Sequence, residues 1–221
     1  MAVCVFDIYV ADGFVLTEFA GVVDVIRLAN RINGNQIFEW NVRSEKGGTI
    51  TASCAVSVET TMLPKRPDAE YLFVLGNSDP ACPALSIGNV IANYTSRQAR
   101  VVLLAEAASR YIAETKDAPH SHTTHWENRA VLMERWGLFD TKATLAVESG
   151  GVITCAGMGA TFDIALSIAS QHASSATMTT VTDILLHERI RHFNTLQPFS
   201  GKEVKTTGDT GLDACIALMQ D

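Results

Sequence analysis

The chain has 221 residues, 47% of them hydrophobic, which is enough for one sizeable α/β domain with an ordinary core. Its formal net charge of -7 argues against a nucleic-acid-binding surface, because such surfaces need clustered Lys and Arg. The five cysteines show neither C-x-x-C pairing nor the spacing of a disulfide framework, so we expect a cytoplasmic protein. No apolar stretch approaches the roughly 18 residues of a membrane span, and we expect no membrane partner.

Short apolar runs and helical patterns alternate along the first half of the chain. Strands are expected over residues 3–10, 38–42, 49–58 (one or two short edge strands) and 71–75. Thr17 is a candidate N-cap for a first helix, and Asn33-Gly34 has the residues that commonly end one. A second helix is expected after Pro80 and Pro83, ending near Ser96.

The second half continues the alternation. A strand over 101–104 runs into a helix that begins at the next residues, and strands over 144–147 and 152–154 flank Gly150-Gly151. A further helix follows Gly159, and two more are expected between Ala176 and Arg191, after a polar stretch that contains three histidines. This order predicts a three-layer α/β sandwich, in which a mostly parallel sheet is flanked by helices.

The corner after residues 101–104 is the most informative point of the sequence. Such strand-to-helix corners present a side chain at the carboxyl edge of a parallel sheet, where α/β proteins place nucleophiles and bind ligands. Here the corner residue is Ala105. Because a methyl group cannot attack a substrate, we predict a cleft that binds a ligand without catalysing a reaction.

Three turns are expected to meet beside this corner and form a ligand site. The site comprises Gly76, Asn77, Ala105, Glu106, His125, Cys155, Ala156 and Gly157. Several members have plainer interpretations. Gly76 and Gly157 could serve only as turn residues, and His125 only as a helix cap. Glu106 could pair with a cationic group of the ligand, or it could be an ordinary carboxylate in the first turn of a helix.

Other chemistry is weakly supported. Cys155 lies beside a glycine turn, where a thiolate would be stabilised, but a small buried thiol is the more common case. His120, His122 and His125 lack further ligands for a metal site, so no metal is expected. The segment 187–192 spaces its histidines five residues apart, which does not fit the zinc-protease motif. The turn at 157–159 lacks the third glycine of a dinucleotide fingerprint, and no cofactor is expected.

The chain divides into a domain over residues 1–196 and a segment over 197–221. The second part opens with Pro, Ser, Gly, Lys and Thr, which is linker composition, and continues into a short helical pattern at 212–219. A helix so short is marginal alone. We therefore expect it to lead into another domain, which this chain lacks.

Residues 23–31, 101–113, 123–127 and 153–157, together with Asp163, resemble the N-terminal domain of a group of AraC-type transcriptional regulators. That domain belongs to the class I glutamine amidotransferase-like, or PfpI-type, superfamily, which implies a flavodoxin-like arrangement. Enzymes of the superfamily carry Cys where this chain has Ala105, and Gly where it has Ala107. Both departures count against catalysis.

The resemblance implies a dimerising sensor domain that binds a small-molecule effector, with an amino acid or a quaternary amine as candidates. DNA would be bound only through a helix-turn-helix domain that follows residue 221. The alternative is a PfpI-type hydrolase or glyoxalase-like enzyme in which Cys155 or a histidine replaces the standard nucleophile.

Overall fold

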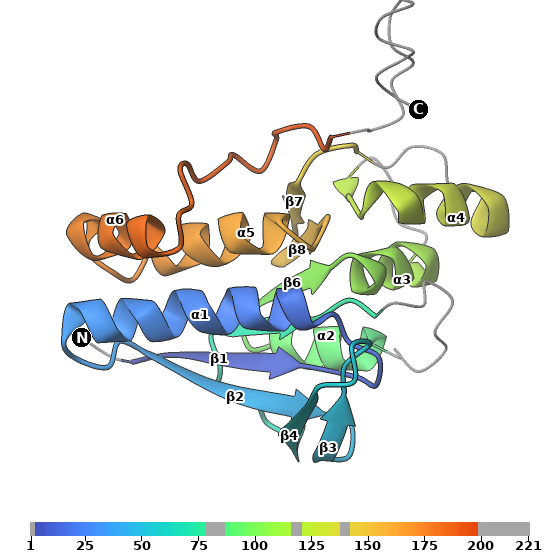
Figure 1. Ribbon diagram of the computed structural model, residues 1–221. Helices are drawn as coiled ribbons and strands as arrows, with labels where there is room; N and C mark the ends of the chain where they lie inside the picture. Colours follow the sequence, from blue (N-terminus) through green and yellow to red (C-terminus); the bar gives the residue numbers. More distant parts are fainter. Residues whose placement is uncertain (1–2, 78–86, 116–120, 138–141, 199–221) are drawn as a thin grey trace, which may run out of the picture.

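The computed structural model describes residues 3–77, 87–115, 121–137 and 142–198. These residues form an eight-stranded, mostly parallel sheet that lies between two layers of helices (Figure 1). This arrangement confirms the three-layer α/β sandwich expected from the alternation of strands and helices.

The sheet has the strand order β3-β4-β2-β1-β5-β6-β8-β7. Its strands are β1 (Cys4–Tyr9), β2 (Phe38–Ser44), β3 (Gly48–Thr51), β4 (Ser57–Met62), β5 (Tyr71–Val74), β6 (Arg100–Leu104), β7 (Ala146–Ser149) and β8 (Val152–Cys155). The pairs β3–β4 and β7–β8 are antiparallel, and the other neighbouring pairs are parallel. Both edges of the sheet are therefore hairpins, and the carboxyl ends of β1, β5, β6 and β8 share one edge.

The central strands are buried on both faces because their side chains alternate between two cores. Phe73 and Val102 point into the larger core, whereas Leu72 and Leu103 point into the smaller one. All four side chains are buried. The continuous apolar runs that predicted these strands follow from this double burial.

Six helices cover the sheet within the described ranges. They are α1 (Leu16–Asn33), α2 (Gly88–Thr95), α3 (Glu106–Thr115), α4 (Trp126–Trp136), α5 (Ala160–Ala169) and α6 (Ser175–Ile184). Side chains of α1, α5 and α6 fill the larger core, and those of α2 and α3 fill the smaller one. Helix α4 packs on α3, farther from the sheet (Figure 1).

The structure corrects several local expectations. Thr17 lies inside α1, and Val15 occupies the N-cap position without a side-chain cap. The polar stretch after residue 121 contains helix α4, which the sequence did not predict. Only one helix, α6, forms between Ala176 and Arg191, because the chain after it is bound to α5 by side-chain contacts. Pro80 and Pro83 lie outside the described residues.

Candidate functional site

Strand β6 passes into α3 through a single residue, Ala105. It has a φ of +43°, in the left-handed region that residues with a Cβ seldom occupy, and it is buried. Its N–H donates to the carbonyl of Cys155 on the neighbouring strand, at 3.0 Å. The corner thus has the strained geometry expected of a nucleophile-bearing turn, but its side chain is a methyl group.

Hydrogen bonds from the following segment hold this corner. The hydroxyl of Thr124 donates to the Ala105 carbonyl at 2.7 Å and lies 2.6 Å from the hydroxyl of Ser109 on α3. All three residues are buried. These contacts fix the chain immediately before His125, which is how a residue far along the sequence comes to the same edge of the sheet.

A residue that the sequence did not single out, Glu18 of α1, closes the space in front of Ala105. Its carboxylate is fully buried and accepts hydrogen bonds from the N–H groups of Gly76 at 2.7 Å and Met158 at 2.9 Å. Burial raises the pKa of Glu18 to about 7, although the two backbone donors lower it and the nearby Glu106 raises it further. From the sequence alone, Glu18 is recognisable only as an acidic residue in the first turn of a helix.

The glycines beside Glu18 leave no room for a side chain. A Cβ added to Gly157, whose φ is +74°, would lie 2.7 Å from the Cβ of Ala105 and 3.0 Å from its nitrogen. A Cβ added to Gly76 would lie 3.1 Å from the Cβ of Ala105 and the same distance from Glu18 Oε2. Both glycines are therefore required by close packing, and the Gly76 N–H faces Glu18 instead of a ligand.

The other members of the predicted site around the corner are also enclosed. Asn77 is buried, and its side-chain amide donates to the carbonyl of Asp12. Glu106 Oε1 accepts from the Asn128 side chain at 3.3 Å. Burial raises the pKa of Glu106, against the lowering effect of nearby donors and of His125. Its Oε2 is buried without a well-formed hydrogen bond.

Cys155 is completely buried at the end of β8. Burial raises the pKa of its thiol to about 12, although the Gly157 N–H, 3.4 Å from the sulfur, lowers it. The thiolate is the nucleophilic form of cysteine, and burial disfavours this form. The environment matches the buried-thiol interpretation.

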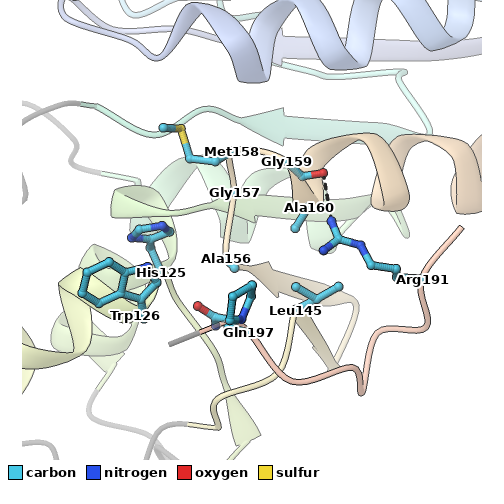
Figure 2. A pocket seen from close by; sticks show the side chains of 11 residues that line it. His125, Trp126, Leu145, Ala156, Gly157, Met158, Gly159, Ala160, Arg191 and Gln197 are labelled. Atoms are coloured by element: carbon cyan, nitrogen blue, oxygen red, sulfur yellow. Dashed lines mark hydrogen bonds between the residues drawn. The ribbon is translucent and has the colours of Figure 1, made fainter. Parts of the chain in front are cut away.

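An open cavity of about 330 Å³ lies next to the corner, on the side of α4 (Figure 2). Its walls are His125, Trp126, Leu145, Ala156, Gly157, Met158, Gly159, Ala160, Arg191, Gln197 and Pro198. Three residues of the predicted site line it: His125, Ala156 and Gly157. The other five, Gly76, Asn77, Ala105, Glu106 and Cys155, do not.

His125 is the N-cap of α4. Its Nδ1 accepts from the N–H of Glu127 at 3.4 Å, so in the neutral ring the proton lies on Nε2. The ring is only partly exposed, and its centre is 5.5 Å from that of Trp126. Together the two rings form one wall of the cavity (Figure 2).

Arg191 forms the opposite wall and is held by Asp163 of α5. Its backbone N–H and its Nε and Nη2 groups donate to the buried Asp163 carboxylate at 2.7 to 3.0 Å, and Nη2 also reaches the Gly159 carbonyl at 3.3 Å. His187 Nε2 lies 3.0 Å from the same carboxylate. Both histidine and arginine come from the segment 187–192, whose spacing suggested no site.

Gln197 forms the floor of the cavity together with Pro198. It was expected to be the first residue of a linker, yet its side chain is buried and its amide contacts the domain. Residues 199–221, which include the short helical pattern, lie outside the described residues.

The part of the chain described by the structure contains no group of three or more His, Cys, Asp or Glu side chains arranged to hold a metal ion. His120 lies outside it. Among the described helices, none combines the length and apolar character needed to cross a membrane.

No protein-family model matches the chain. It is 21% identical over 211 residues to the HTH-type transcriptional regulator GbdR of Pseudomonas aeruginosa (strain UCBPP-PA14), with 95% of this chain and 58% of the relative covered. It is 23% identical over 210 residues to the HTH-type transcriptional regulator GlxA of Rhizobium meliloti (strain 1021), with 94% and 65% covered. The chain thus spans less than two thirds of the length of these relatives.

Solved structures agree on the fold. An AraC family transcriptional regulator from Pseudomonas putida superposes with a TM-score of 0.68 at 16% identity, over 82% of this chain and 99% of that one. A ThiJ/PfpI family protein from Pseudomonas syringae superposes with a TM-score of 0.66 at 16% identity, over 100% of this chain and 87% of that one. The chain therefore has the fold of PfpI-like proteins, and it is similar in sequence to HTH-type transcriptional regulators.

Proposed function

We propose that this chain is the ligand-sensing, dimerising regulatory domain of an AraC-type transcriptional regulator and that it catalyses no reaction. The observation that carries the proposal is the corner at Ala105, which keeps a positive φ at the end of β6 but has no reactive atom. A strained backbone without a nucleophile, next to an open cavity, suits recognition without bond-making.

The cavity has the chemistry to bind a small zwitterion. Arg191 Nη1 makes no hydrogen bond to any described residue, whereas Asp163 holds the rest of the guanidinium, so Nη1 can donate to a ligand carboxylate. Trp126 is 42% exposed and presents a ring that attracts cations. A volume of about 330 Å³ suits a small metabolite. An amino acid carries both charges, and so does a quaternary amine that also bears a carboxylate.

Among the described residues, the side chains near the corner do not support the enzymatic alternative. Cys155 is buried with its pKa raised to about 12, and His125 caps a helix without a nucleophile beside it. Glu18 occupies the space in front of Ala105 and saturates the Gly76 N–H that an oxyanion would need.

In the proposed regulator, the effector would act by favouring one arrangement of two subunits in a cytoplasmic homodimer. DNA would be contacted by a helix-turn-helix domain beyond residue 221. The effector shifts this equilibrium only if it binds the two arrangements with different affinity. Light scattering tests the dimer, because a monomer at every concentration would contradict this part of the proposal.

Ligand binding is tested by thermal denaturation of the chain with the twenty L-amino acids and their N,N,N-trimethyl derivatives. A ligand that binds only the folded state raises the melting temperature by mass action. We expect at least one member of the panel to do so. If every compound leaves the melting temperature unchanged, the proposed ligand class is wrong.

A variant that fills the cavity gives the matched control. Gly159 lines the cavity at a φ of -62°, and a Cβ there would meet no atom within 4 Å. Gly159→Leu should therefore fold normally and lose the ligand-induced shift. If the variant responds to the ligand as fully as the unmodified chain, the ligand binds elsewhere.

A further inference from the structure

The two ends of the Gln197 side-chain amide have different surroundings. Its Nε2 donates to the carbonyls of Thr124 at 2.8 Å and Thr144 at 2.9 Å, and to the hydroxyl of Thr123 at 3.3 Å. The two carbonyl oxygens on one side identify that end as the nitrogen, because an amide oxygen there would face two acceptors.

The oxygen of the same amide is unsatisfied. Gln197 is only 5% exposed. Its Oε1 is buried and has no hydrogen-bond partner among the described residues. Figure 2 shows this oxygen on the side of the cavity where His125 and Trp126 lie. A buried acceptor without a donor is unfavourable, so a ligand that supplies an N–H group there gains affinity.

Gln197 also belongs to the last described segment of the chain, residues 195–198. Its N–H donates to the Ala143 carbonyl at 2.8 Å, and the Leu145 N–H donates to the Thr195 carbonyl at the same distance. Pro198, the next residue, is a wall of the cavity. The cavity and the last described segment therefore share Gln197 and Pro198.

We infer that Gln197 recognises an N–H group of the ligand and thereby couples occupancy of the cavity to the position of residues 195–198. This inference rests on the proposed function and narrows its ligand class to zwitterions whose ammonium group keeps at least one hydrogen. A quaternary ammonium group has no N–H and leaves Oε1 unsatisfied. Because Oε1 is closed to solvent, its engagement requires a displacement of Gln197 or Pro198.

The test is a calorimetric titration with two methylation series, glycine and L-leucine, each as the free amine and its N-methyl, N,N-dimethyl and N,N,N-trimethyl forms. The last methyl group removes the last N–H while the net charge is unchanged. We expect the affinity to fall about tenfold between the dimethyl and trimethyl forms, a difference typical of one lost hydrogen bond.

Gln197→Met keeps a side chain of similar length but has no amide. In this variant we expect the dimethyl and trimethyl forms to bind equally, with the trimethyl affinity unchanged. Leu196→Ala is the matched control, since Leu196 is half exposed, neighbours Gln197 and does not line the cavity. It should keep the tenfold step.

Hydrogen exchange of the Gln197 and Leu145 amides gives a second measurement that needs no variant. Their rates should change when the unmodified chain is saturated with the dimethyl form, and not with the trimethyl form. This readout decides the question even if Gln197→Met does not fold.

The outcomes separate the two claims. If the trimethyl form binds the unmodified chain as tightly as the dimethyl form, the inference is wrong while the proposed function stands. An equal loss for all forms in a folded Gln197→Met would give Gln197 a structural role only and overturn the inference. If neither series nor any member of the larger panel binds, the proposed function fails and the inference fails with it.

Discussion

Two turns at the carboxyl edge of the sheet have similar backbones and opposite surroundings. At the end of β6, Ala105 has a φ of +43°; after β8, Gly157 and Met158 have φ values of +74° and +50°. The first turn is packed against Glu18 and is closed to solvent, whereas the second lines an open cavity. Among the described residues, the cavity therefore lies at the turn after β8 and not at the corner that resembles a catalytic site.

Under the proposed function, the difference separates the packed corner from the part of the edge that binds the ligand. Glu18 accepts hydrogen bonds from the N–H groups of Gly76 and Met158 and so connects α1 to both turns. The cavity opens only beyond this connection, toward α4 and Arg191 (Figure 2). Four predictions test how sharply the two turns differ.

The largest effect is expected for Gly157→Ala. The added Cβ would overlap Glu18 and lie 2.7 Å from the Cβ of Ala105, at a positive φ. Overpacking and left-handed strain together should lower the free energy of unfolding by about 4 kcal/mol, measured by urea denaturation. Gly151→Ala is the control, because Gly151 has a φ of +81° with no atom near its Cβ position, so it should show only the smaller conformational cost. Equal losses would mean that the β6 corner is not tightly packed.

Asp163→Asn should loosen the attachment of Arg191, which forms one wall of the cavity, and lower the stability of the fold. The carboxylate is buried and receives four hydrogen bonds from Arg191 and His187. Breaking a buried pair leaves a charge without its partner, and we expect a loss of about 3 kcal/mol in urea denaturation. Asp24→Asn, which removes an exposed pair with Arg27, should change stability by less than about 1 kcal/mol. A loss as small as that of the control would contradict a role for Asp163 in holding the segment.

Glu18 should make the stability of the closed turn depend on pH. Burial raises its pKa from 4.5 to about 7, so the folded state binds the proton more tightly than the unfolded state. Its stabilising contribution is complete below the unfolded pKa of 4.5, decreases as the pH rises to about 7 and is constant above. The decrease amounts to at most about 3 kcal/mol.

Glu18→Gln should remove this dependence, so its stability relative to the unmodified chain should rise between pH 4 and pH 8. Denaturation at several pH values measures the difference between the two proteins, in which the other titrating groups cancel. Glu39→Gln, which changes an exposed carboxylate on β2, is the control for removal of a carboxylate. Parallel profiles for Glu18→Gln and the unmodified chain would show that the pKa of Glu18 is the same in the folded and unfolded states.

The smallest response is expected from Cys155. With the thiol buried and its pKa about 12, iodoacetamide at neutral pH should not modify it in the folded chain, whereas the exposed Cys54 should react. Mass spectrometry after timed labelling distinguishes the two within one sample. Rapid modification of Cys155 would revive the enzymatic alternative.

Much of the architecture was predictable because it depends on local patterns. The apolar runs of β5 and β6 and the glycine after α1 have direct physical signals, and the structure places these elements where the sequence did. Helix α4 was missed because its buried contacts are few and include Asn128, so it lacks the apolar stripe of an amphipathic helix.

The site was predicted in part. His125, Ala156 and Gly157 line the cavity, because strand ends meeting at one edge can be inferred from strand order. Glu18 and Arg191 could not be identified, since an acidic residue early in a helix and an arginine after one are both common on surfaces. Only long-range contacts give them a role.

The sequence by itself determined the layered α/β arrangement and the absence of a reactive atom at residue 105, because hydrophobic periodicity and side-chain chemistry are local properties. Tertiary structure decided which part of the edge is open. Glu18, Asp163 and Gln197 act through partners 58, 28 and 73 residues away, respectively. Whether a turn is filled or empty depends on such contacts, which no local pattern encodes.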